Sequence, residues 1–137
     1  MSCTVDFTDR TGACTLRRSP GGSRGGHWGV SRLPHGFVDR LRDSVYGASN
    51  SVVALFLFGS YARGEADQES DVDICVFYDD SEADFVDVLG KVGSAIEWIR
   101  RRHGLRYDLI LFPQREWESE RNMLVSRIKR DGIYLPE

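Results

Sequence analysis

Three aspartates and a glycine-serine pair are the residues of this chain whose types and spacing could carry out chemistry. Gly59 and Ser60 end an apolar run, Val52–Phe58, and Asp71 and Asp73 follow about ten residues later. Side chains alternate faces along a strand, so Asp71 and Asp73 are expected to project from one side, with Cα atoms roughly 6–7 Å apart. Carboxylates held this way can share divalent cations, and a small Gly-Ser turn lets backbone N–H groups approach phosphate oxygens. The pattern therefore predicts a metal-nucleotide site.

These residues also resemble a known motif. Gly59–Gly64 (GSYARG), followed by Ser70–Asp73 (SDVD), is similar to the defining motif of the DNA polymerase β-like nucleotidyltransferase superfamily. The short chain most resembles its minimal nucleotidyltransferases, the MNT proteins often paired with HEPN toxins, from about Pro34 to the C-terminus. The family pattern needs a third carboxylate on a later strand, and Asp108 within Leu105–Phe112 supplies one.

The resemblance implies roles for the three acids. Asp71 and Asp73 would bind Mg²⁺, and Asp108 would complete the metal on the nucleophile side or accept the proton of the acceptor. Two Mg²⁺ ions about 3.5–4 Å apart can clamp the attacking and leaving oxygens of such a reaction. Alone, Asp71 would be an ordinary surface acid at the start of a strand. Asp73 and Asp108 each interrupt a predicted buried strand, where an unpaired carboxylate is costly.

The turn itself has two interpretations. The family places it against the β- and γ-phosphates, which makes Gly59 and Ser60 phosphate-binding residues. Ser60 could also cap the helical turn that follows. Arg63 could steady the triphosphate as a charged hydrogen-bond donor, or it could be a solvated helix residue.

The function that follows is transfer of AMP from ATP to a hydroxyl group. Resemblance to MNT antitoxins implies a protein acceptor, a tyrosine on a cognate HEPN toxin that AMPylation would inactivate. Two alternatives remain open: an enzyme that modifies a small hydroxylated molecule, as aminoglycoside nucleotidyltransferases do, and a non-catalytic antitoxin that binds and occludes its partner. A neighbouring gene for a small helical protein with an Arg-x₄₋₆-His motif would favour the toxin pair.

Composition limits the partners. The chain has 137 residues with 41% hydrophobic and 28% charged residues, which suits one globular domain. Five of its 18 basic residues but only two of its 21 acidic residues fall within residues 1–33, so the remainder is acidic. An acidic body argues against nucleic-acid binding, which requires phosphate neutralisation. No run of roughly 18–20 apolar residues or hydrophobic signal region is present, and three cysteines form no even framework, so we expect a cytoplasmic protein with reduced thiols and no membrane contact.

The pattern of elements predicts a small α/β (α+β) domain, and the resemblance implies a mixed sheet flanked by helices. Residues 1–33 lack a sustained period and are expected to form a flexible Gly/Arg/Ser-rich tail before a nucleotidyltransferase domain at residues 34–137. Trp98 and Trp117 are expected to pack rather than bind a base, and Tyr107 to face away from Asp108. Expected elements are a helix from Phe37 to about Gly47, strands Val52–Phe58, Asp71–Tyr78 and Leu105–Phe112, a helical turn near Tyr61–Gly64, a long helix capped by Ser81 and ended by Gly104, and a last helix from about Arg115 to Arg130.

Overall fold

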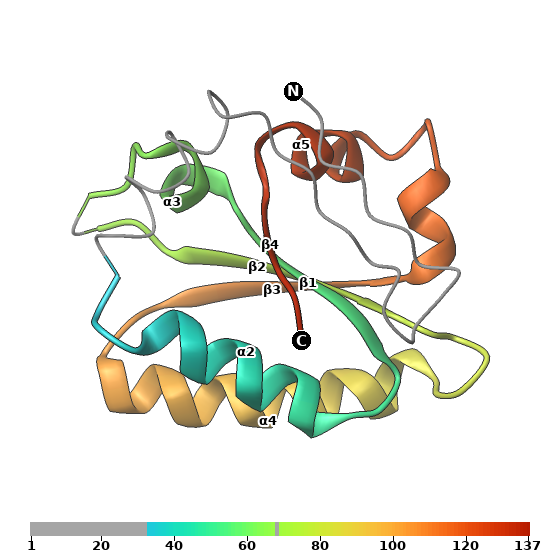
Figure 1. Cartoon of the computed structure of the whole chain (residues 1–137), viewed down its shortest axis with the longest axis horizontal. Helices are drawn as coiled ribbons and strands as arrows, with labels where there is room; N and C mark the ends of the chain where they lie inside the picture. Colours follow the sequence, from blue (N-terminus) through green and yellow to red (C-terminus); the bar gives the residue numbers. More distant parts are fainter. Residues whose placement is uncertain (1–32, 68) are drawn as a thin grey trace.

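A four-stranded mixed sheet with helices on both faces forms the architecture of the computed structural model, which describes residues 33–67 and 69–137 (Figure 1). The strands lie in the order β3-β2-β1-β4; β2 and β3 run parallel, and β1 is antiparallel to both β2 and β4. The elements in chain order are α2 (Phe37–Ala48), β1 (Val52–Phe58), α3 (Gly59–Arg63), β2 (Val72–Tyr78), α4 (Phe85–His103), β3 (Tyr107–Pro113), the 3₁₀ helix η1 (Gln114–Glu118), α5 (Met123–Asp131) and β4 (Ile133–Leu135).

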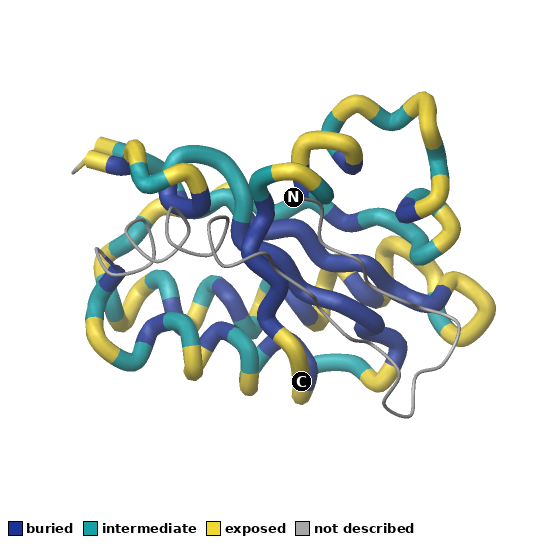
Figure 2. The backbone as a smooth tube through the Cα atoms, turned by 45° about the horizontal axis from the view of Figure 1, so that its top comes forward, coloured by how far each residue is buried: buried dark blue, intermediate teal, exposed yellow. Residues whose placement is uncertain are grey.

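Strand alternation divides the apolar side chains into two cores. Along β2, Ile74 and Val76 point into a larger core under α2 and α4, whereas Cys75 and Phe77 point into a smaller core under η1 and α5. Figure 1 shows α2 and α4 together on one face and α5 on the other; α3, at the end of β1, lies beside α5 and buries Tyr61 and Ala62 in the larger core. The two central strands, β1 and β2, are buried along nearly their whole length (Figure 2). The sheet therefore supports the residues that lie on its α5 face.

The prediction of one last helix from about Arg115 to Arg130 is wrong, because the structure has two separate helices there, η1 and α5. Trp117 is buried in the smaller core and stacks on Phe56 with ring centroids 5.3 Å apart, so η1 ends just after it. A new helix then begins after Asn122, whose side-chain oxygen accepts a hydrogen bond from the Val125 N–H at 3.1 Å. The chain then returns through β4, a strand that the sequence did not single out.

Two further expectations need correction. The cap of α4 is Asp84, which accepts a hydrogen bond from the Asp87 N–H at 2.8 Å, whereas the Ser81 hydroxyl donates to Asp79. Trp98 does not pack in the core: its side chain is 60% exposed, with the Arg102 guanidinium 5.7 Å from the ring centroid. Packing of Trp117 was predicted correctly.

The predicted tail lies outside the described residues, except for Leu33, which is buried in the larger core. Among the helices of the described residues, none combines the length and the apolar character that crossing a membrane would require.

Candidate active site

The glycine-serine turn stands directly against one of the predicted acids. Gly59 begins α3 immediately after β1 and has φ +74°, a conformation that side chains other than glycine rarely adopt. A Cβ atom built on Gly59 would lie 1.9 Å from Oδ2 of Asp73. Ser60 does not cap α3, because the N-cap position is Phe58 and no side chain caps this helix. Only glycine allows the turn and the carboxylate to occupy these positions together.

Strand pairing brings the acids to one edge of the sheet. Asp73 is in register with Phe58 at the end of β1 and with Asp108 near the start of β3. Asp71 precedes β2 by one residue. The strand β1 runs antiparallel to β2, and β3 runs parallel to β2. The end of β1 and the starts of β2 and β3 therefore meet at this edge. Asp73 and Asp108 stand on the α5 face of the sheet, while Tyr107 packs against the larger core on the opposite face, as predicted.

The charges of these acids act on one another. Partial burial, followed by the neighbouring carboxylates of Asp108 and Asp71, raises the pKa of Asp73 above its ordinary value, and the Arg63 guanidinium partly offsets this rise. The carboxylates of Asp71 and Asp108 therefore act electrostatically on Asp73. This arrangement favours a cation or a proton at Asp73.

Asp71 already faces a cation of the chain. Nε of Arg106 lies 3.0 Å from Oδ1 of Asp71, but without the geometry of a hydrogen bond, and this oxygen is buried with no hydrogen-bond partner. A buried carboxylate oxygen in this state is suited to a hard divalent cation, which prefers oxygen ligands. Within residues 33–67 and 69–137, however, no three His, Cys, Asp or Glu side chains stand close enough to form a metal-binding group. The donor chemistry fits Mg²⁺, while a closed set of ligands is not formed.

A cavity of about 300 Å³ opens beside the turn. It is lined by Gly59, Ser60, Arg63 and Asp73 from the predicted set, together with Phe58 and three residues of α5: Leu124, Arg127 and Asp131. Asp71 and Asp108 are not part of the lining, although the pKa of Asp73 responds to both. Arg127 and Asp131 are not among the site residues predicted from the sequence. Their spacing with Leu124, at intervals of three and four, was the available signal, because it places all three on one side of a helix.

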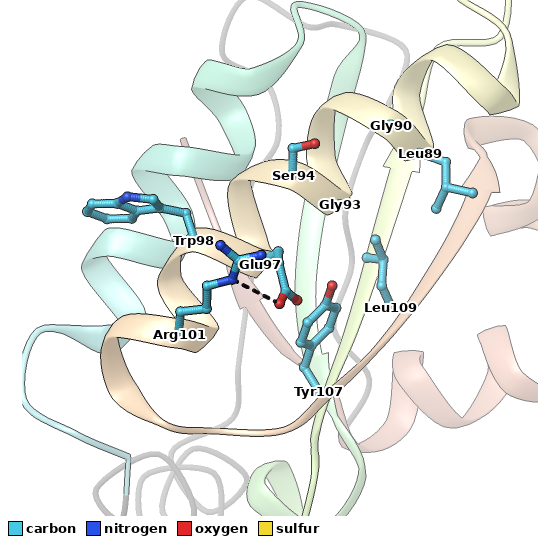
Figure 3. A pocket seen from close by; sticks show the side chains of 9 residues that line it. All are labelled: Leu89, Gly90, Gly93, Ser94, Glu97, Trp98, Arg101, Tyr107 and Leu109. Carbon is cyan, nitrogen blue, oxygen red and sulfur yellow. Dashed lines mark hydrogen bonds and ion pairs between the residues drawn. The ribbon is translucent and has the colours of Figure 1, made fainter.

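A larger cavity, about 560 Å³, lies elsewhere, between α4 and β3 (Figure 3). Figure 3 shows Tyr107 and Leu109 on one side of it and Glu97 of α4, ion-paired with Arg101, on the other. It contains neither the glycine-serine turn nor any of the three predicted acids. Size alone would select this cavity, but the glycine-serine turn and Asp73 line the smaller one.

Comparison with known proteins identifies the class. Residues 38–135 match the family model described as a nucleotidyltransferase domain. This match covers most of the chain, so the chain belongs to the nucleotidyltransferase domain family. The fold is similar to a crystal structure from Sulfolobus solfataricus provisionally titled a nucleotidyltransferase, with a TM-score of 0.52, 18% identity, and coverage of 79% of this chain and 82% of that one.

Two proteins of Methanocaldococcus jannaschii, both carrying the provisional name protein adenylyltransferase, are similar in sequence. One is 43% identical over 60 residues, which are 43% of this chain and 56% of that protein. The other is 29% identical over 79 residues, 58% of this chain and 74% of that protein. The match thus spans little more than half the length of the first relative.

Proposed function

We propose that this chain transfers AMP from ATP to a hydroxyl group on another protein. The observation that carries the proposal is the glycine turn at Gly59 held against Asp73, with Asp108 in register on the next strand. The family match supports nucleotidyl transfer, and the names of the two archaeal relatives support a protein as the acceptor.

In the proposed reaction the acceptor oxygen attacks the α-phosphorus of ATP, the bond from this phosphorus to the bridging oxygen breaks, and pyrophosphate leaves. Gly59, Ser60 and Arg63 would hold the β- and γ-phosphates through backbone N–H groups, a hydroxyl and a guanidinium. Asp108 is exposed beside Asp73 and would take the proton of the acceptor or help to hold a metal.

Asp71, Asp73 and Asp108 would hold Mg²⁺, and Asp71 is the one of the three whose carboxylate faces the Arg106 guanidinium. When bound, Mg²⁺ neutralises charge on the triphosphate and on the leaving pyrophosphate. We further propose the acceptor to be a tyrosine of a cognate HEPN-type toxin. This step rests on the resemblance of GSYARG and SDVD to MNT antitoxins.

The test is transfer of label from ATP labelled at the α-phosphate, in Mg²⁺, with and without a small helical partner carrying Arg-x₄₋₆-His. We expect label on the partner with the native chain. With Asp108→Asn the single-turnover rate should fall by about 10²–10⁴. ATP affinity should stay within about tenfold, or about 1.4 kcal/mol, because the triphosphate contacts remain.

Asp43→Asn is the matched control, since Asp43 is an exposed acid of α2 paired with Arg42. It should transfer at the native rate. Native-rate transfer by Asp108→Asn would exclude both roles of Asp108. Silencing of the partner without label transfer would instead indicate an antitoxin that acts by occlusion, and label on a small hydroxylated molecule alone would replace the protein acceptor.

A further inference from the structure

A cation from α5 faces the same cavity as the glycine-serine turn. Arg127 lines this cavity with Gly59, Ser60 and Asp73, although it lies 67 positions after Ser60 in the sequence. The helix α5 is held against the sheet, because its residues Val125 and Ile128 are buried in the smaller core. Figure 1 shows α3 and α5 on the same side of the sheet. The position of Arg127 is therefore set by packing rather than by a loop.

Arg127 differs from the other cations near the site in having no partner within the described part of the chain. Arg63, the second arginine of the cavity, has its Nε 3.2 Å from a carboxylate oxygen of Glu65. Arg106 pairs with Asp71, and Arg130, a neighbour on α5, pairs with Asp131. Arg127 is exposed, and none of the hydrogen bonds or ion pairs of the described residues involves it.

We propose that Arg127 binds the β- and γ-phosphates of the nucleotide from the side opposite the glycine-serine turn. This proposal rests on the proposed function. The bound triphosphate is strongly anionic and stands beside Asp73, whose neighbours Asp71 and Asp108 add further negative charge. A guanidinium without an ion-pair partner can neutralise the charge of the triphosphate. Its paired N–H groups can donate two parallel hydrogen bonds to phosphate oxygens. Arg127 thereby favours a nucleotide with a triphosphate over one with a single phosphate.

The experiment compares the affinities of ATP, pyrophosphate and AMP, each in Mg²⁺, for the native chain and for Arg127→Gln. Hydrogen bonds to charged groups support an expected loss of about 10–100-fold for ATP and pyrophosphate. AMP, which lacks the β- and γ-phosphates, should change less than about threefold. Arg127→Lys keeps the charge without the paired donors and should recover part of the loss.

Arg121→Gln is the control for charge, because Arg121 is an exposed arginine just before α5 and is not part of the cavity lining. It should bind all three probes as the native chain does. Glutamine is well tolerated in helices, and thermal unfolding should confirm that Arg127→Gln is folded.

The possible outcomes distinguish failure of the Arg127 proposal from failure of the proposed function. Unchanged ATP affinity in Arg127→Gln, with binding and transfer intact in the native chain, overturns the role of Arg127 and leaves the proposed function standing. An equal loss for ATP and AMP also overturns it, since a phosphate contact must discriminate between them. A native chain that binds no ATP in Mg²⁺ overturns the proposed function and this inference with it.

Discussion

Gly59 and Asp73 form the pair of residues on which the site depends. The positive φ of Gly59 and the closeness of Oδ2 of Asp73 to its missing Cβ each exclude another residue at position 59. Asp73 in turn carries an elevated pKa because it is partly buried beside two other acids. Groups with perturbed pKa values cluster at functional sites, so Asp73 is a candidate functional residue.

The raised pKa of Asp73 leads to a prediction for Asp73→Asn. A carboxyl group whose pKa is raised on folding favours the folded state fully below its ordinary pKa of 3.8, and this advantage is lost as the pH rises through the folded pKa. Near pH 7.5 without divalent ions, the neutral variant should therefore be more stable than the native chain. Because Asp73 is only half-buried, we expect a gain of about 1 kcal/mol or less, a rise of at most roughly 4–8 °C in the unfolding midpoint for a domain of about this size.

Thermal unfolding from pH 4 to pH 8 measures the effect, which should shrink as the pH approaches 4. Addition of Mg²⁺ should raise the midpoint of the native chain and not that of Asp73→Asn. Asp43→Asn, the exposed acid on α2, should follow the native chain in both respects. An Asp73→Asn chain less stable than the native one at every pH would contradict the electrostatic account.

At the scale of elements, α5 carries the part of the candidate site that is distant in sequence from the glycine-serine turn, and β4 follows α5. Gly132 joins them, and its N–H donates to the Ile128 carbonyl at 2.8 Å to close α5. A Cβ atom at Gly132 would lie 2.5 Å from that same carbonyl oxygen. The tight exit allows β4 to return beside β1 while α5 stays over the smaller core.

We therefore predict opposite effects for two glycine substitutions. Gly132→Ala forces backbone atoms apart and should destabilise the fold by about 1–3 kcal/mol. It should also weaken ATP binding, because α5 carries Arg127 and Asp131. Gly47→Ala should stabilise by about 0.5–1 kcal/mol, since Gly47 lies inside α2 with open space around its Cβ position. Denaturant unfolding compares the two, and a stable Gly132→Ala chain with native ATP affinity would show that the exit of α5 can relax.

At the scale of the whole molecule, the two cores on opposite faces of the sheet have different roles. The larger core, under α2 and α4, fixes the sheet, and the smaller core positions η1 and α5 beside the acids. Both cores are assembled from residues between Leu33 and Leu135. Within the part of the chain that the structure describes, these two cores hold the elements that carry the candidate site.

A shortened chain that begins at Ser31 is accordingly expected to fold and to keep its transfer activity. Leu33, the first described residue of the larger core, remains in such a chain. The measurements are the cooperativity of thermal unfolding and the rate of AMP transfer, each against the full chain. A broad, non-cooperative transition would show that residues 1–30 belong to the folded core.

The sequence alone determined the parts of this protein that depend on local chemistry. The apolar run before Gly59, the alternation around Asp73 and the glycine-serine motif sufficed for β1, β2 and the family, because these follow from neighbours in the chain. Only the tertiary structure decided the rest. The burial of Trp117 split the last helix, and Arg106 met Asp71 across two chain segments. The packing of α5 on the smaller core brought Arg127 to a turn that is distant in sequence, because long-range packing, and no local pattern, sets where a helix lies.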